Sequence, residues 1–415
     1  MKDEKKAPKL RFKVFTDDWE QCKFGGIGTF KGGFGFPENE QGNIDGIPFY
    51  KVSDMNDCCN ALTMKKASNY VTKSQIIKNN WKPFLNKNII FAKVGAAVYL
   101  ERKRKAVGPF LLDNNMMVFQ PNNANIDYIY YTFQRLQLSK HVQVGTLPSL
   151  NASELENITI FIPSLAEQKV VADFGATIDH TITLHEEKQR QLERLKKALL
   201  EKMFRDETGY PILRFKGFNN VWKQRKLGEV SSLRGRIGFR GYKQTDLVEK
   251  GKGAITFSPS DIDANGNISF LNNKYISIRK YEESPEIQVN TGDILFTKTA
   301  SIGKIGYVKK LNEKATINPQ IALLTPKIDF NGYFIFLSIR NDAFMRKVQK
   351  IVGGSSVPTM SQEKLKNLTI NFPSSIEQHK LANIFLKIDG LITLHQHKID
   401  NLKHLKRALL QKMFV

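Results

Sequence analysis

The feature that most constrains this chain is a long internal repeat. The segment "LKKALLEKMF" occupies residues 195–204, and "LKRALLQKMF" occupies residues 405–414. The repeat extends upstream without a gap, because residues 145–204 align with residues 355–414 and 26 of those 60 positions are identical. The chain is therefore expected to fold one structural unit twice.

The same order of motifs precedes each repeat. The stretch "PKLRFKVFTDDWEQCKFG" (8–25) matches "PILRFKGFNNVWKQRKLG" (211–228), and "NIIFAKVG" (88–95) matches "DILFTKTA" (293–300). Two copies are too few for a solenoid, which needs at least three repeats. A length of 415 residues also suits two or three domains rather than one core.

The body of each copy is predicted to mix strands and helices. Short apolar, β-favouring runs bounded by Asn, Gly or Pro predict strands at 88–94, 157–163, 293–299, 316–326 and 367–373. Helical length and spacing predict helices at 126–142 and 332–352.

Each copy is predicted to end in a long helix. Ser164 with Glu167, and Ser374 with Glu377, form Ser-x-x-Glu capping boxes that start these helices. About 40 residues follow, or roughly 60 Å of helix. A narrow, mainly apolar stripe marks one face of each helix. Its positions are 171, 174, 178, 182, 185, 192, 195 and 199 in the first helix, and 381, 384, 388, 392, 395, 402, 405 and 409 in the second. Such a stripe would be left in water on a lone helix, so we expect the two helices to pair as a coiled coil.

Polar residues interrupt the stripe on both helices. Gln189 stands where the second copy has Ile399, so the first stripe has one polar gap. His185 and His395 fall on the stripe in both copies. They either fix the register of the helices as polar seam residues or serve a metal or pH role.

The charge of the chain indicates an anionic partner. The net charge is +23 and the isoelectric point is near 9.7, as a polyphosphate-binding surface requires. Residues 164–204 carry no net charge and residues 374–415 carry +4, which leaves about +19 on the remainder of the chain. The excess is therefore expected on the globular bodies.

Several classes of protein are disfavoured. The N-terminus has no apolar signal-peptide core, no apolar run reaches the roughly 18 residues of a membrane span, and three cysteines lack Cys-x-x-Cys spacing. These features predict a cytoplasmic protein. The glycine-rich 25–36 matches neither a Walker A loop nor a dinucleotide fingerprint, so it is interpreted as a turn and bulge with positive φ, or as backbone that approaches a phosphate. No catalytic or metal-binding constellation is predicted.

Taken in order, the motifs resemble those of the DNA-specificity subunit of type I restriction–modification systems, over essentially the whole chain. The resemblance rests on Trp-x-x-x-Lys-x-Gly at Trp19 and Trp222, on "GDILFTKTASIGKIG" (292–306), and on the Pro-Ser-x-x-Glu-Gln helix starts at Pro163 and Pro373. The repeated helix ends complete it. One departure is that Val98 and Tyr99 replace the Gly303 and Lys304 of the second copy.

The resemblance implies an α+β fold of two mixed α/β target-recognition domains in pseudo-symmetric tandem duplication, separated by two long helices that form an antiparallel coiled coil. The expected segments are a first recognition domain (1–163), a central spacer helix (164–204), a second recognition domain (205–373) and a C-terminal spacer helix (374–415). Each domain would read one half of a bipartite site in double-stranded DNA.

The resemblance also implies partners. Two methylase subunits would dock on the helices and motor–nuclease subunits would join the complex, with no membrane involved. This chain would hold no cofactor and would not be an enzyme, while the partner subunits would use S-adenosylmethionine, ATP and magnesium.

DNA contacts are expected from basic residues and from one Gly-Ser loop. The candidates are Lys93, Arg102, Lys103, Arg104, Lys105, Arg234, Arg236, Arg240, Lys298, Lys304, Ser355 and Ser356. Three other functions stay open: a specificity subunit for a fused restriction–methylation enzyme, a degenerate stand-alone DNA methyltransferase or nuclease, and a coiled-coil adaptor without a DNA role.

Overall fold

The structure is a computed structural model of the full chain, and it describes residues 7–143, 145–204, 210–236, 241–352 and 359–415. Contacts divide the chain into two compact units. The first unit combines residues 1–186 with 396–415, and the second comprises residues 187–395. The four expected segments differ from this division because each long helix contributes one part to each unit.

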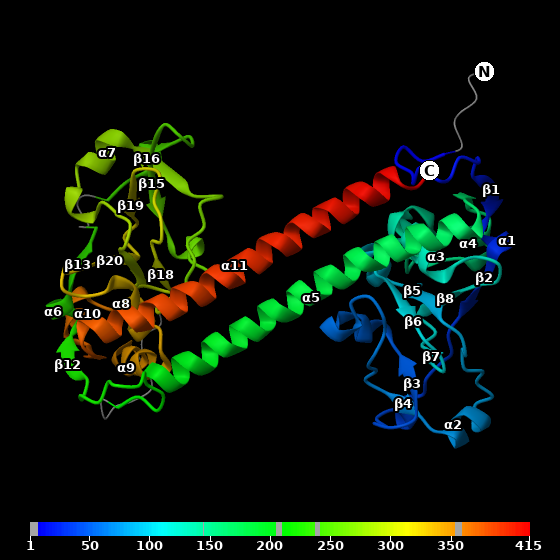
Figure 1. Ribbon diagram of the computed structural model, residues 1–415, viewed down its shortest axis with the longest axis horizontal. Helices are drawn as coiled ribbons and strands as arrows, with labels where there is room; N and C mark the ends of the chain where they lie inside the picture. The colour runs from blue at the N-terminus through cyan, green and yellow to red at the C-terminus, as the bar shows by residue number, and fades with distance from the viewer. Residues whose placement is uncertain (1–6, 144, 205–209, 237–240, 353–358) are drawn as a thin grey trace. The chain divides into compact units, whose positions relative to one another are not determined.

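Two sheets form the body of the first unit (Figure 1). Their strands are β2 (Gly28–Gly32), β3 (Ile47–Tyr50), β4 (Tyr70–Val71), β5 (Asn88–Ala92), β6 (Lys103–Ala106), β7 (Leu111–Leu112) and β8 (Met116–Pro121). The larger sheet is antiparallel in the order β2-β8-β5-β6, and the smaller has the order β4-β3-β7 with β3 and β7 parallel. Two ribbons accompany them: β1 (Glu20–Lys23) with β11 (Thr159–Ile162), and β9 (Val142–Gln143) with β10 (Ser149–Leu150).

The second unit repeats this plan. Its strands are β12 (Lys223–Lys226), β13 (Ser231–Gly235), β14 (Leu247–Val248), β15 (Gly253–Phe257), β16 (Lys274–Ser277), β17 (Ile294–Thr297), β18 (Ile305–Tyr307), β19 (Ala315–Ile317), β20 (Ile321–Pro326) and β21 (Thr369–Phe372). The sheet β13-β20-β17-β18 matches β2-β8-β5-β6, and β15 lies parallel to β19 as β3 does to β7. The duplication read from the sequence is thus a duplication of topology.

The helices complete each unit. The first copy has α1 (Phe24–Ile27), α2 (Lys73–Lys78), α3 (Ile126–Arg135), α4 (Ala152–Glu156) and α5 (Leu165–Phe204). The second has α6 (Leu227–Val230), α7 (Ile278–Glu282), α8 (Gly332–Ile339), α9 (Asp342–Val352), α10 (Gln362–Asn367) and α11 (Ser375–Lys412). The α+β class is confirmed, as are the two long helices.

Two predicted elements are divided in the structure, and a third ends early. The strand predicted over 316–326 is divided into β19 and β20, because the Asn318 side chain accepts a hydrogen bond from the Gln320 amide and turns the chain. The helix predicted over 332–352 is divided into α8 and α9, because the Asn341 side chain accepts from the Phe344 amide and caps a new helix. The helix predicted over 126–142 ends at Arg135 and is followed by a 3₁₀ turn.

The capping-box prediction was half right. The Ser164 hydroxyl accepts a hydrogen bond from the Glu167 amide, but the Glu167 carboxylate does not complete the box. Instead, the Arg11 guanidinium donates two hydrogen bonds to it at 2.8 and 2.7 Å. The buried Glu167 therefore fastens α5 to the segment that enters its own domain.

The second copy repeats this clamp. Ser374 caps α11, and Arg214 donates to both oxygens of Glu377 at 2.7 and 2.8 Å. The glutamine that follows in each motif ties the helix to the body, since Gln168 accepts from the amide of Asn125 and Gln378 from that of Asn331. The Pro-Ser-x-x-Glu-Gln motif is thus a structural fastening.

Within each unit, one part of α5 packs antiparallel against one part of α11. In the first unit, Lys406 Nζ lies 2.6 Å from Asp179 and Lys403 Nζ lies 2.7 Å from Glu186, so the two helices run in opposite directions. Ile178, Ile182 and Ile399 are buried between them. In the second unit, Lys196 Nζ lies 2.6 Å from Asp389. The predicted antiparallel pairing is confirmed inside each unit.

Parts of the predicted stripe lie outside the seam. Leu195 and Leu405 are 48% and 49% exposed, so they do not pack between the helices. His185 and His395 are partly buried, and neither belongs to a cluster of metal ligands among the described residues. The repeated helix ends are instead held by their last residues: Met203 and Phe204 enter the core of the second unit, and Met413 and Phe414 enter that of the first.

The glycine-rich segment was interpreted as a turn and bulge with positive φ, or as backbone that approaches a phosphate. The first interpretation was wrong, because no glycine of residues 25–36 lies in the left-handed region. Gly28 has extended backbone with φ 176, and a side chain there would lie 2.4 Å from the Phe119 ring. A side chain at Gly33 would lie 2.1 Å from the Asp113 carbonyl oxygen. These glycines allow strands to approach closely, which requires a missing Cβ rather than a left-handed conformation.

Candidate nucleic-acid interface

One basic residue occupies the same structural position in both domains. Lys93 and Lys298 each follow an inner strand of the larger sheet, β5 or β17. Their backbones are held alike: the amide of Lys93 donates to Asn115 and that of Lys298 donates to Gln320, both at 2.8 Å. Burial lowers the pKa of Lys298. The predicted pairing of these lysines across the duplication is confirmed as a structural equivalence, while their contact with DNA stays a prediction.

The loop that follows Lys298 is sharply bent. Ala300 has φ 61 and Gly303 has φ 89, both in the left-handed region. An L-residue at such a φ is strained by about 1 kcal/mol or more, and in the first domain Gly95, with φ 79, stands where Ala300 stands in the second. The loop ends at the exposed Lys304, whose Nζ donates to the Pro259 carbonyl oxygen at 3.3 Å. The bend presents this lysine beside a second loop.

The basic run of the first domain is largely engaged inside the protein. Lys103 is 2% exposed, forms a salt bridge with Glu101 at 2.5 Å and donates to the Leu136 carbonyl oxygen. Burial lowers its pKa, although Glu101 opposes that shift. Lys105 pairs with Asp127 at 2.8 Å and lies over the Tyr130 ring. Charge reversal at either lysine would therefore disturb folding before it tested DNA binding.

The two arginines of the run differ. Arg104 donates to the Lys103 carbonyl oxygen, and burial lowers its pKa. Arg102 is partly exposed and donates to the Asn56 side chain. Of the four residues in the run, Arg102 is the one whose exposure best suits a contact with phosphate.

The remaining candidate DNA-binding residues of the second domain also differ in their exposure. Arg234 is exposed and donates weakly to the Glu286 carbonyl oxygen at 3.3 Å. Arg236 is buried, donates to the Ile317 carbonyl oxygen and the Thr316 hydroxyl, and stacks on Tyr242. It braces β13 against β19 and is a poor candidate for direct contact with DNA. Arg240, Ser355 and Ser356 lie outside the described residues.

One group of three possible metal ligands occurs in the described part of the chain, the consecutive Asp57, Cys58 and Cys59. Cys22, Cys58 and Cys59 are free thiols. Within the same residues, no helix is long and apolar enough to cross a membrane.

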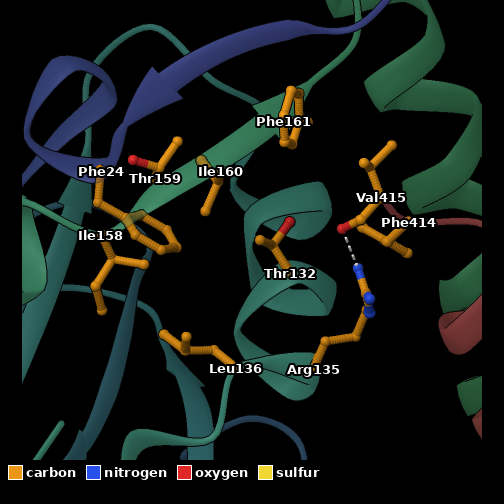
Figure 2. A pocket seen from close by; sticks show the side chains of 10 residues that line it. All are labelled: Phe24, Thr132, Arg135, Leu136, Ile158, Thr159, Ile160, Phe161, Phe414 and Val415. Atoms are coloured by element: carbon orange, nitrogen blue, oxygen red, sulfur yellow. Dashed lines mark hydrogen bonds between the residues drawn. The ribbon is translucent and has the colours of Figure 1, made fainter. Parts of the chain in front are cut away.

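The first unit also contains a cavity of about 280 Å³ beside β11. Figure 2 shows its lining, with Arg135 donating to the Val415 carbonyl oxygen. In the second domain, α9 lies beside the corresponding strand, since Lys347 donates to Thr369, the counterpart of Thr159 in this lining. The first domain has a 3₁₀ turn (Leu138–His141) in place of α9, so the surroundings of β11 and β21 differ.

Known proteins share the sequence features of this architecture. The profile of the type I restriction modification DNA specificity domain matches residues 16–194 and 219–404. The specificity subunit of the type I restriction enzyme MjaVIII from Methanocaldococcus jannaschii is 24% identical over 320 residues, covering 72% of each chain. The specificity subunit of the type I restriction enzyme EcoBI from Escherichia coli is 20% identical over 438 residues, covering 96% of this chain and 86% of that one.

Solved structures share the fold. The S subunit of a type I restriction–modification system from M. genitalium superposes with a TM-score of 0.63 at 14% identity, covering 99% of each chain. A chain from a type I R-M system gives a TM-score of 0.52 at 16% identity, covering 95% of this chain and 97% of that one. The family profile covers both copies of the repeat. This chain therefore belongs to the type I restriction–modification DNA specificity family and carries two of its specificity domains.

Proposed function

We propose that this chain is the DNA-reading subunit of a type I restriction–modification complex and that it has no catalytic centre of its own. Each domain would read one half of a bipartite site in double-stranded DNA. The observation that carries the proposal is the duplicated plan: two bodies with the same topology, each held to one long helix by an arginine–glutamate clamp and to the end of the other through its core. Such a plan fits a protein that reads two separate half-sites.

The basic surface supports a phosphate-binding role. About +19 of the net charge lies outside the two long-helix segments, residues 164–204 and 374–415. Lys304, Arg234 and Arg102 lie on loops or strand ends and have exposed or partly exposed side chains. Contacts with phosphate supply affinity without sequence information. We therefore assign these residues to positioning rather than to reading.

The helices supply matching docking surfaces in our proposal. Leu184 and Leu394 occupy equivalent positions and are 51% and 47% exposed, as Leu195 and Leu405 are also equivalent and half-exposed. Exposed leucines on duplicated surfaces fit two copies of one partner. We propose that these partners are two methylase subunits, which would bring S-adenosylmethionine, and that motor–nuclease subunits would bring ATP and magnesium chemistry in the cytoplasm.

A reconstitution experiment tests this function. The isolated chain should bind DNA weakly and transfer no methyl groups, whereas adding its methylase subunit should give adenine methylation at a bipartite sequence. Binding of radiolabelled S-adenosylmethionine to the isolated chain, or methyl transfer by it, would favour a stand-alone methyltransferase instead. A chain that bound no DNA in the reconstituted complex would point to a coiled-coil adaptor.

A further inference from the structure

The second domain contains a polar cavity at the meeting point of three connections. Its volume is about 330 Å³. The three connections are the segment Ser258–Ser260 that follows β15, the β17–β18 loop and the β19–β20 turn. The lining side chains are Tyr242, Thr256, Ser258, Pro259, Ser260, Lys274, Thr299, Ser301, Asn318 and Gln320.

The chemistry of this lining suits a neutral ligand with both donors and acceptors. Hydroxyl and amide side chains can donate as well as accept hydrogen bonds. Among the described residues that line the cavity none is acidic, and Lys274 is the one with a charge. The Thr256 side chain is buried, with the residue 1% exposed, and its hydroxyl has no hydrogen-bond partner in the described structure. A buried hydroxyl without a partner costs free energy unless a ligand or water satisfies it.

The same backbone frame exists in the first domain. The amide of Asn318 donates to the Phe257 carbonyl oxygen as that of Asp113 donates to Tyr50, both at 2.9 Å. The side chain of Asn318 then accepts from Gln320 at 3.0 Å, as that of Asp113 accepts from Asn115 at 2.9 Å. The turn is therefore built identically in both copies.

The connection after β15 is duplicated in the same way. The amide of Ser258 donates to Asp261 at 2.7 Å, and that of Lys51 donates to Asp54 at 2.8 Å. The loop after β17 matches the loop after β5 as well. Thr299 forms an isolated antiparallel β-bridge with Thr359, and Val94 forms the same kind of bridge with Ser149. All three backbone connections around the cavity thus have counterparts.

The side chains on this frame differ between the copies. Asn318 replaces Asp113 and Gln320 replaces Asn115. Ser258 likewise corresponds to Lys51, and Ser301 to Ala96. The hydrogen bonds common to both copies use backbone groups and the side-chain oxygens of the turn residue and of the aspartate after β15 or β3. The second copy adds contacts of its own, because the Asn318 side-chain amide donates to Gln320 Oε1 at 3.2 Å and the Ser258 hydroxyl donates to Asp261. A constant frame with different side chains is the arrangement expected where two domains read different sequences.

We propose that this frame is the base-reading site of each domain, with Asn318, Gln320 and Ser301 determining the half-site read by the second domain and Asp113 and Asn115 that read by the first. This inference rests on the proposed function. Amide side chains pair with adenine through a donor and an acceptor, whereas a carboxylate accepts from cytosine. Lys304 and Lys274 border the cavity and would hold the neighbouring phosphates.

The test exchanges side chains between the two copies. Asn318→Asp with Gln320→Asn gives the second domain the turn residues of the first, and the reciprocal variant is Asp113→Asn with Asn115→Gln. Each pair of residues is already compatible with this turn, because the other copy folds with it. The full chain is coexpressed with its methylase subunit, and methylated adenines are mapped across the genome.

We expect each double variant to alter its own half of the methylated sequence and leave the other half unchanged. A good pair of base contacts is worth about tenfold or more in discrimination, so methylation at the parent site should fall by at least that factor. Asn312→Ala, on an exposed residue outside the cavity lining, should keep the parent sequence. Ser301→Ala provides a second, milder variant, because Ala96 stands at that position in the first domain.

The outcomes separate the inference from the function on which it rests. A wild-type complex that methylates no bipartite sequence would overturn the proposed function. A wild-type complex that does so, with both double variants and Ser301→Ala marking the same sequence at full level, would overturn the reading site alone. Equal thermal unfolding midpoints of variant and wild type would show that a changed sequence reflects reading rather than stability.

Discussion

At the scale of residues, the two copies keep the same charged contacts where they fasten helix to body. Arg11 with Glu167 repeats as Arg214 with Glu377. Asp179 with Lys406 repeats as Asp389 with Lys196, and a tyrosine of the body donates to each aspartate. Buried charges are tolerated when they are paired and hydrogen-bonded. These contacts therefore specify how each helix meets its domain.

Removing one partner of the first clamp should be costly. Arg11→Ala leaves the Glu167 carboxylate, whose side chain is 2% exposed, without its cation. We expect the free energy of unfolding of the first unit to fall by about 3 kcal/mol, measured by urea denaturation. Arg190→Ala, on an exposed arginine of α5, should change it by less than about 0.5 kcal/mol. Adding Glu167→Gln to Arg11→Ala should restore part of the loss, and a loss no larger than the control's would contradict the clamp.

The buried aspartate of the second unit should make stability depend on pH. Burial raises the pKa of Asp389, but the charge of Lys196 and hydrogen bonds from Lys196 and Tyr333 outweigh that effect, so the pKa is lowered. A lowered pKa in the folded state stabilises it above the unfolded value of about 4, and this contribution is lost as the pH falls further.

Unfolding experiments between pH 5 and pH 3 test this prediction. The stability advantage of the wild type over Asp389→Asn should shrink steadily as the pH falls through this range. Asp329→Asn, at an exposed position, should follow the wild type. An advantage that is constant across the range would show that the ionised Asp389 adds nothing.

At the scale of elements, the two long helices have matched lengths between their contacts. From Asp179 to Lys196 on α5, and from Asp389 to Lys406 on α11, the sequence separation is the same, 17 residues. This corresponds to about 25 Å of helix. Lengthening one helix alone between these residues would leave the other too short to keep both ion pairs. The helices are therefore expected to act together as a spacer.

Insertions test whether the helices set the spacing of the DNA site. Four residues added near Gln189 in α5, and four near Ile399 in α11, should keep the complex active, because they rotate the seam by only about 40° beyond a full turn. They add about 6 Å of helix, or close to two base pairs of duplex. Mapping of methylated sites should show that the unread DNA between the two half-sites has lengthened by about that amount.

Two controls accompany this experiment. Insertions of two residues at the same positions turn the seam by roughly 200° and should abolish assembly. The four-residue insertion in α5 alone should assemble less well than the matched pair. If the protein with both four-residue insertions is active and still recognises half-sites at the parent separation, the helices do not set the spacing of the DNA site.

At the scale of the whole molecule, each compact unit takes helix segments from both halves of the sequence. The first unit contains the last residues of the chain, and Leu10 donates a backbone hydrogen bond to Lys412. The second unit repeats this contact from Leu213 to Lys202. The body of each domain nevertheless comes from one continuous stretch. Reading should therefore be modular even though the supporting helices are shared.

A domain exchange tests that modularity. Replacing residues 1–163 by the equivalent part of a relative should change one half of the methylated sequence and leave the other intact. Because the replaced part includes Arg11, the donor must carry an arginine at that position to pair with Glu167. A chimera that altered both halves would show that the two bodies do not read independently.

Much of this architecture follows from the sequence by itself. A repeat of 26 identities in 60 residues determined the duplication, and capped apolar stripes determined two long helices. Such features are local in sequence, so the periodicity of a helix and the alignment of two copies reveal them directly. The family could be recognised for the same reason, since its motifs are short and keep their order.

Only the tertiary structure decided which side chains are available for binding. Lys103 and Arg236 belong to basic runs in the sequence, yet both are buried. Lys103 lies in β6 and pairs with Glu101, and Arg236 follows β13 and donates to the Ile317 carbonyl oxygen. Glu167 reads as a capping residue, but an arginine 156 positions away binds it. The polar cavity joins connections that are distant in the chain. Long-range contacts of this kind depend on how the elements pack, and no local pattern of residues records them.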